Sequence, residues 1–255
     1  MGVSRTCTIV VCGKGGTGKT TISALLVRSF IEAGVRPVLA VDADPNANLH
    51  EALGVDLAET LGCMREEAFT RSIPPGMDRT SYIKYRFRTV LVEAEGFDLL
   101  AMGRPEGTGC YCFPNSLLGE CMHLLGEEYP VTVVDSEAGL EHISRGTVRR
   151  PDILLIVSDP GKRGLRTARR IRDLAVSLGL GTTPMYLVVN RYKGERPPAE
   201  NLSGEGLPLL AAIPEDAAVE DADLRGAPVA WVGEGSGARA AVRDLAAQVL
   251  GRCGR

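Results

Sequence analysis

The chain has 255 residues, of which 44% are hydrophobic and 24% charged, enough apolar material for one domain with a substantial core. Its net charge of −3 and pI near 5.7 exclude a general attraction to nucleic acid or anionic membranes, because both polyanions favour basic surfaces. No apolar run approaches the ~20 residues that span a bilayer, and the start lacks a signal peptide's apolar core. We therefore expect a single domain over residues 1–255, located in the cytoplasm, with neither a nucleic-acid nor a membrane partner.

Seven short apolar runs, rich in β-branched residues, alternate with longer amphipathic stretches. The runs are Thr8 to Val11, Pro37 to Val41, Asp98 to Met102, Val131 to Val134, Ile153 to Val157, Tyr186 to Val189 and Leu209 to Ile213. Apolar strands separated by helices are typical of a parallel sheet covered on both faces. We predict an α/β, doubly wound, mostly parallel sheet of about seven to eight strands, with ligands at the carboxyl ends of the strands.

A glycine-rich loop links the first predicted strand to a helical pattern that ends at Gly34. Glycines let successive N–H groups turn toward one anion, and the helix N-terminus adds its positive end. The order of strand, loop and helix predicts a phosphate loop; the alternative is a glycine-rich turn that merely matches the pattern. The predicted nucleotide-binding residues are Gly13, Lys14, Gly15, Gly16, Thr17, Gly18, Lys19, Thr20 and Thr21. We expect Lys19 at the β- and γ-phosphates, Thr20 at magnesium and Thr21 beside the α-phosphate.

Two carboxylates, Asp42 and Asp44, follow the second predicted strand at period-two spacing. Both could serve the phosphates; the alternative is an Asp-Pro turn that closes the strand. The charged, proline-interrupted region at about 60–96 breaks the rhythm of strands and helices. We expect it to form a helical or hairpin excursion over the site.

Two thiols, Cys110 and Cys112, flank a tyrosine in the stretch from Gly107 to Leu118. Two thiolates leave a tetrahedral site half filled, so a second copy on a two-fold axis would complete four ligands for zinc, nickel or an iron–sulfur cluster. The alternative is that both are buried small hydrophobes. The glycines before the pair and Pro114 after it favour an exposed loop.

The other five cysteines are too scattered for a disulfide framework, and a cytoplasmic chain would keep them reduced. They are Cys7, Cys12, Cys63, Cys121 and Cys253. We expect the first two in the core and assign no metal to any of the five. Arg166, Arg169 and Arg170 share one face of a predicted helix. That face is expected to be solvated, with an acidic client as the alternative, and His142 is expected to be structural.

The phosphate loop resembles the KGGxGKT deviant form of the MinD, ParA and nitrogenase iron protein class of dimeric ATPases. The resemblance implies that Lys14 reaches across the dimer interface to the partner's phosphates and that Asp44 orients the water that hydrolyses ATP. With Lys19 these form the expected catalytic set. Asp42 and Asp135 are implied in the magnesium shell, although many relatives have proline where this chain has Glu137.

The same class implies contacts between adenine and Asn190, which ends a predicted strand, and between adenine and Pro214 and Glu215, which follow the last strand. An ordinary strand-terminal asparagine is the alternative for Asn190. The guanine signature is absent, which favours ATP over GTP.

A narrower resemblance rests on four stretches, CGKGGTGKTT, VDADPNANL, GTGCYC with FPNSLLG, and VVDSEAGLEHISRGT. They look like the CooC-type accessory ATPases that help insert nickel into carbon monoxide dehydrogenase, from the phosphate loop to about residue 170. The resemblance implies a homodimer with nickel or zinc bound by Cys110 and Cys112 of both subunits, and a client that is this enzyme or acetyl-CoA synthase. Two alternatives stay open: a MinD/ParA-like positioning ATPase, and an iron-protein-like reductase with an interfacial iron–sulfur cluster.

Overall fold

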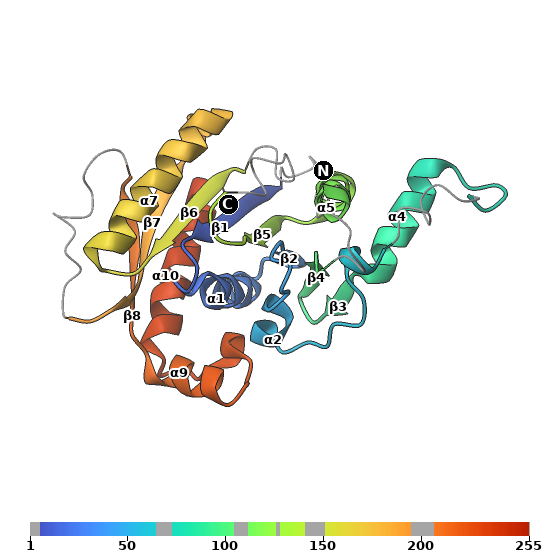
Figure 1. Ribbon diagram of the computed structural model, residues 1–255. Coiled ribbons are helices and arrows are strands. Elements are labelled where there is room, and N and C mark those ends of the chain that lie inside the picture. The colour runs from blue at the N-terminus through green and yellow to red at the C-terminus, as the bar shows by residue number, and fades with distance from the viewer. Residues whose placement is uncertain are drawn as a thin grey trace.

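A computed structural model of the protein describes residues 6–64, 73–104, 112–125, 128–140, 151–194 and 207–254. Its centre is an eight-stranded sheet in the order β3-β4-β2-β5-β1-β6-β7-β8 (Figure 1). The strands are β1 (Cys7–Gly13), β2 (Val38–Asp42), β3 (Val92–Ala94), β4 (Phe97–Ala101), β5 (Val131–Asp135), β6 (Ile153–Ser158), β7 (Met185–Tyr192) and β8 (Leu209–Pro214). All neighbours pair in parallel except β3, which is antiparallel to β4. The predicted α/β, mostly parallel, doubly wound sheet is confirmed.

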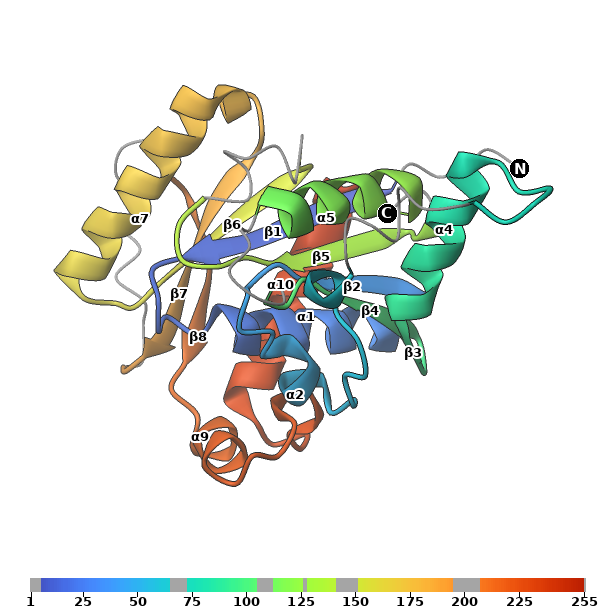
Figure 2. The ribbon, with the colours of Figure 1, turned by 45° about the vertical axis from the view of Figure 1, so that its right-hand side comes forward.

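Helices cover both faces of this sheet (Figures 1 and 2). One face carries α1 (Lys19–Glu32), α2 (Leu49–Leu53), α9 (Ala217–Leu224), η4 (Val229–Trp231) and α10 (Gly237–Arg252). The other carries η1 (Leu61–Cys63), α4 (Arg79–Val90), α5 (Cys112–Leu125), α7 (Lys162–Ala175) and the π-helical turn η3 (Val176–Leu180). Each face has its own hydrophobic cluster, because alternate side chains of the buried strands point to opposite sides.

Helix α1 lies deep in the first of these layers, between the sheet, α10 and η4. Arg28 on this helix donates to the carbonyls of Ala230 and Val232 at 2.7 and 2.9 Å. Its guanidinium also lies 5.1 Å from the centroid of the Trp231 ring. These contacts satisfy the carbonyls of η4 and fix it against the helix that follows the phosphate loop.

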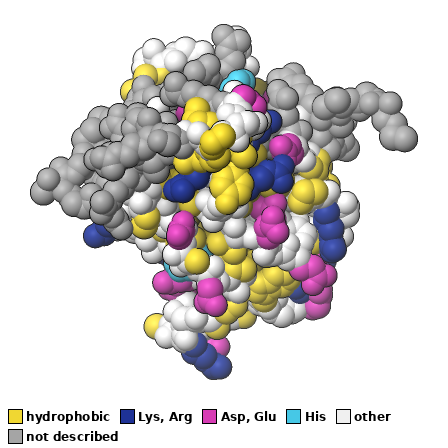
Figure 3. Space-filling view, turned by 90° about the vertical axis from the view of Figure 1, so that its right-hand side faces the viewer, with side chains coloured by type: hydrophobic (Ala, Val, Ile, Leu, Met, Phe, Trp, Pro, Cys, Tyr) yellow, Lys and Arg dark blue, Asp and Glu magenta, His cyan; other side chains and the backbone are white. Residues whose placement is uncertain are grey.

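The region at about 60–96 contains η1, α4 and β3, and its residues 65–72 lie outside the described part. Asp78 caps α4 by accepting from the backbone N–H of Ser81 at 3.1 Å. Helix α4 packs on α5 at the β3 end of the sheet. Hydrophobic side chains gather on this end of the molecule (Figure 3), where Ile73, Met77 and Tyr85 are exposed.

Cys7 at the start of β1 and Cys253 after α10 form a disulfide, with their Cα atoms 6.0 Å apart. The expectation of thiols throughout is therefore wrong for this pair. Their 246-residue separation conceals that α10 brings the C-terminus beside β1 (Figure 1). Cys12 is in the core as expected, Cys121 is also buried, and Cys63 is an exposed thiol. Among the described helices, none is long and apolar enough to cross a membrane.

Candidate functional site

The loop from Gly13 to Gly18 joins the carboxyl end of β1 to α1 and needs glycine at two positions for reasons of space. A Cβ on Gly13 would lie 2.3 Å from the carbonyl oxygen of Val157, and one on Gly18 would lie 2.3 Å from Nδ2 of Asn190. Both glycines also have φ in the left-handed region, at +153° and +86°. The loop is thus held tightly against β6 and β7, with its backbone free to turn N–H groups toward an anion.

Side chains from within the loop and from β7 brace it. Thr17 Oγ1 donates to the Lys14 carbonyl at 2.8 Å, and Asn190 Nδ2 donates to the Thr17 carbonyl at 2.8 Å. Arg191, which has a left-handed φ of +54°, donates to the Gly16 carbonyl at 3.2 Å. Asn190 is therefore tied to the phosphate loop itself, a positioning contact that its place at a strand end did not predict.

The two lysines of the loop have opposite environments. Lys19, at the first position of α1, is only 9% exposed, and its Nζ lies 3.4 Å from the Lys14 carbonyl. Lys14 is exposed. One ammonium group is thus held inside the loop, whereas the other projects from it and is free to reach a second molecule.

Two buried carboxylates lie side by side at the ends of β2 and β5. Asp42 and Asp135 are register partners, 1% and 2% exposed. Asp135 accepts from Thr20 Oγ1 at 2.7 Å and from Ser23 Oγ at 3.0 Å. Asp42 accepts two backbone N–H groups, one from Leu49 at 2.7 Å. Ser23 was missed in the sequence, although its position three residues after Thr20 puts both hydroxyls on one helix face.

Burial raises the pKa of both carboxyl groups. The pKa of Asp42 rises to about 7, chiefly by desolvation and then by repulsion from Asp135. Desolvation also raises the pKa of Asp135 to about 6, against the hydrogen bonds from Thr20 and Ser23 that lower it. Carboxylate and hydroxyl oxygens are ligands that Mg²⁺ prefers. A divalent cation here would favour the charged form of both groups, so the donor set fits magnesium.

Asp44 has different hydrogen-bond partners from Asp42. Its Oδ1 accepts from the backbone N–H and the side-chain amide of Asn46, at 2.8 and 3.0 Å. Arg104 in turn donates to the amide oxygen of Asn46. This is the Asp-Pro turn that the sequence left open as an alternative role for Asp44.

The segment after β5 contacts the phosphate loop directly. Gly139, with φ +92°, donates its N–H to the Gly13 carbonyl at 3.2 Å, and Ser136 donates to the Val11 carbonyl. These hydrogen bonds therefore couple the backbone conformation of the phosphate loop to that of residues 136–139. His142 and the rest of residues 141–150 lie outside the described part of the chain.

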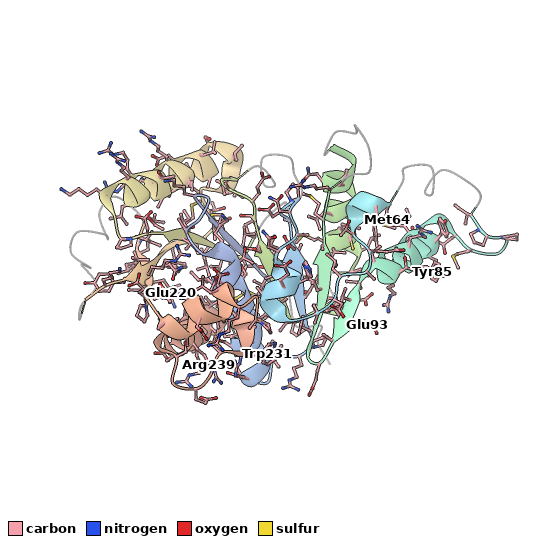
Figure 4. The ribbon with its side chains drawn as sticks, turned by 60° about the horizontal axis from the view of Figure 1, so that its bottom comes forward. Met64, Tyr85, Glu93, Glu220, Trp231 and Arg239 are labelled. Atoms are coloured by element: carbon pink, nitrogen blue, oxygen red, sulfur yellow. A yellow bond between two sulfur atoms is a disulfide. The ribbon has the colours of Figure 1, made fainter. Side chains whose placement is uncertain are left out.

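A narrow cleft with a cavity volume of about 60 Å³ opens beside α1, between the ends of β7 and β8 and helix α9. Its wall includes Asn190, Pro214 and Glu215, the three residues expected near a base, and also Leu25, Val219 and Glu220. Glu220 projects from α9 on this side of the molecule (Figure 4). An open hollow of about 610 Å³ shares Thr21 and Asp223 with the cleft. Together they form a trench around the start of α1, with apolar and polar walls suited to a nucleoside.

The structure describes only part of the Cys-Tyr-Cys stretch. Cys110 and the side chain of Cys112 lie outside the described residues, but α5 begins at Cys112. Because α5 follows parallel β4 and leads back to the start of β5, it begins at the carboxyl edge of the sheet (Figure 2). This is the edge that carries the phosphate loop. In the described ranges, no group of three or more His, Cys, Asp or Glu side chains is placed to hold a metal.

The sequence profile of the CobQ/CobB/MinD/ParA nucleotide binding domain matches residues 8–229. The chain belongs to this family. It is 38% identical to an uncharacterized ATP-binding protein of Methanocaldococcus jannaschii, over 96% of this chain and 98% of that one. It is 34% identical to the carbon monoxide dehydrogenase accessory protein CooC of Rhodospirillum rubrum, over 86% of this chain and 87% of that one.

Solved structures agree with this assignment. The septum site-determining protein MinD of Pyrococcus horikoshii, complexed with Mg-ADP, superposes with a TM-score of 0.73 at 26% identity, covering 96% of each chain. A ParA family ATPase of Chlorobium tepidum shares the fold, with a TM-score of 0.76 at 21% identity, covering 96% of this chain and 98% of that one. The chain is a nucleotide-binding ATPase of the MinD/ParA class.

Proposed function

We propose that this ATPase closes a homodimer when it binds ATP, holds nickel between the two copies, and assists nickel insertion into carbon monoxide dehydrogenase or the related acetyl-CoA synthase. The observation that carries the proposal is that α5 begins at Cys112, the second cysteine of the Cys-Tyr-Cys stretch, on the sheet edge that also bears the phosphate loop. The 34% identity to a carbon monoxide dehydrogenase accessory protein supports the choice of client. The working compartment in this proposal is the cytoplasm.

The nucleotide would lie along the trench around the start of α1. Backbone N–H groups of residues 13–21 would bind the phosphates, with Lys19 at the β- and γ-phosphates. The adenine would enter the cleft beside Asn190, Pro214 and Glu215. Thr20, Asp42 and Asp135 would hold Mg²⁺, which when bound supplies positive charge at the phosphates.

Asp44 would orient the attacking water. In the present arrangement its carboxylate is occupied by Asn46. Both contacts fall on Oδ1, so the proposal assigns the attacking water to the other carboxylate oxygen of Asp44, Oδ2. Hydrolysis would then reset the dimer after the metal has moved.

Lys14 would couple ATP to the dimer. A ligand shifts an equilibrium only by its differential affinity for the two states. An exposed lysine that reaches the partner's phosphates makes ATP bind more tightly to the closed dimer than to the separate subunits. Closure would then bring Cys110 and Cys112 of both copies together as four thiolates, a ligand set that suits square-planar nickel and also zinc.

Nickel binding by a double variant, Cys110→Ser with Cys112→Ser, tests the proposal. Purified anaerobic protein is dialysed against Ni²⁺ with ATP, and bound metal per monomer is measured together with mass in solution. We expect half a nickel per monomer in a dimer for the parent and for a control Cys63→Ser variant, and none for the double variant. If the double variant binds nickel and dimerises like the parent, the pair is structural and only the ATPase assignment remains.

A further inference from the structure

Helix α7 has a charge opposite to that of the chain that carries it. Its 14 residues include one acidic residue, Asp173, which forms an ion pair with Arg172, and six basic residues. They are Lys162, Arg163, Arg166, Arg169, Arg170 and Arg172. The whole chain has a net charge of −3, so removing these six positive charges leaves −9 for the remainder. Helix α7 is therefore a strongly basic element of an acidic protein.

The packing of α7 leaves this charge on its outer side. The helix buries only Gly164, Ala168, Ile171 and Ala175, a narrow stripe of mostly small residues that rests on the sheet. Arg163, Arg166 and Arg170 recur three or four positions apart and are exposed. Within the described part of the chain, none of these three guanidinium groups has an acidic partner. Nitrogen-tipped side chains of this helix project away from the body in Figure 4.

Exposed apolar side chains follow the arginines at the end of the helix. Leu174 follows Arg170 by four positions and is 46% exposed. Val176 and Leu178, in the π-helical turn η3, are 50% and 38% exposed. A row of arginines that ends in exposed aliphatic side chains has the composition of a protein interface, in which arginine and apolar residues are enriched.

We infer that the outer face of α7 and η3 is a docking surface for an acidic segment of a partner protein. The arginines match its carboxylates and steer the encounter, and the aliphatic end supplies the apolar area that a nucleic-acid backbone would not use. A bilayer would need the apolar side of an amphipathic helix, but that side of α7 is buried against the sheet. The inference goes beyond the proposed function and does not depend on which metal is carried.

Charge reversal on the outer face tests this inference. The variant is Arg163→Glu, Arg166→Glu and Arg170→Glu, and the control is Arg36→Glu, Arg225→Glu and Arg243→Glu, which changes the net charge equally at exposed arginines elsewhere. Binding of a fluorescent peptide of glutamate pairs alternating with leucine is measured by anisotropy. We expect the α7 variant to bind it about tenfold more weakly than the parent, and the control to bind within about twofold of the parent. A further variant, Leu174→Ser with Leu178→Ser, should also weaken binding.

Three outcomes would overturn the inference. Equal peptide binding by the two charge-reversed variants would show that the arginine row has no special role. Tighter binding of duplex DNA than of the peptide, lost only in the α7 variant, would assign the face to nucleic acid. Self-association without ATP that only the α7 variant lacks would assign it to a second copy. ATP hydrolysis and nickel binding, measured on the same samples, report on the proposed function separately.

Discussion

Helices α1 and α7 have the same length of 14 residues, and both start at the carboxyl edge of the sheet. They differ greatly in how many of their residues are buried. Ten residues of α1 are buried, because the sheet lies on one side of it and α10, α2 and η4 lie on the others. Only four residues of α7 are buried. Function can therefore reside at different places on the two helices. On α1 only the N-terminal end is free to meet a ligand, whereas on α7 a whole face is available to a partner.

The largest expected effect comes from the functional end of α1. Replacing Lys19 by alanine removes the one buried cation at the phosphate loop. We expect ATP hydrolysis to fall by about 100-fold or more, since a fixed charge at the transferring phosphoryl group is lost. Phosphate release measures it. A Lys84→Ala variant should hydrolyse ATP like the parent, and similar losses in both variants would contradict the role of Lys19.

Core truncation compares the two helices directly. Leu26 on α1 is 0% exposed, so Leu26→Ala should lower the free energy of unfolding by about 2–5 kcal/mol. Leu174 on α7 is 46% exposed, and Leu174→Ala should change it by no more than about 0.5 kcal/mol. Urea denaturation followed by circular dichroism gives both values. Equal losses would show that the outer face of α7 is packed rather than free.

The disulfide stabilises the layer that holds α1, because it joins β1 to the end of α10. A cross-link over a long loop typically contributes about 2–4 kcal/mol, so Cys253→Ser should lower the free energy of unfolding by that amount. Reduction of the parent should have the same effect, and reduction of the variant should have none. If adding reductant leaves the melting temperature of the parent unchanged, the disulfide does not stabilise the protein.

A smaller effect is expected where Asp216 caps the helices that flank the cleft. It accepts from the N–H groups of Ala218 and Ala238, at the starts of α9 and α10, and from Ser236 Oγ. Desolvation opposes its charge, but these hydrogen bonds outweigh it and leave the pKa of Asp216 below the ordinary value. A depressed pKa stabilises the fold above the unfolded pKa of about 3.9 and loses that effect as the pH falls.

Asp216→Asn should therefore lower the free energy of unfolding by about 1 kcal/mol at neutral pH. The difference from the parent should shrink as the pH falls below about 4. Urea denaturation at several pH values measures it. A difference that stays constant down to acid pH would mean that the charge of Asp216 contributes nothing.

Much of the fold was predictable because its signals are local. Each of the seven predicted runs overlaps one of the parallel strands, since apolar β-branched runs between helical patterns determine them. The short strand β3 was not separated from the excursion, because Val92–Ala94 is half exposed and pairs with only one neighbour. The pairing of β3 with β4 depends on the turn at Gly96, which the apolar run of β4 does not reveal.

The parts of the candidate site that a sequence motif determines through the backbone conformation were predictable. The hydrogen-bond partners of its side chains were less predictable. The loop glycines and Asp42 follow from local spacing after predicted strands, and Asp135 follows from the family resemblance. The turn contacts of Asp44, the bond from Asn190 to Thr17, and the Cys7–Cys253 disulfide join atoms in ways that no local pattern encodes. Tertiary packing decides these, so they became clear only in three dimensions.

In the proposed function ATP completes the metal site by closing the dimer, and Lys14 links the two events. The most direct test is nickel bound per monomer in a Lys14→Ala variant at saturating ATP, with binding of a fluorescent ATP analogue measured on the same sample. We expect the variant still to bind the nucleotide but to hold almost no nickel, whereas the parent holds half an equivalent. A variant that binds the nucleotide and as much nickel as the parent would contradict it, because the thiolates would then not need the closed dimer.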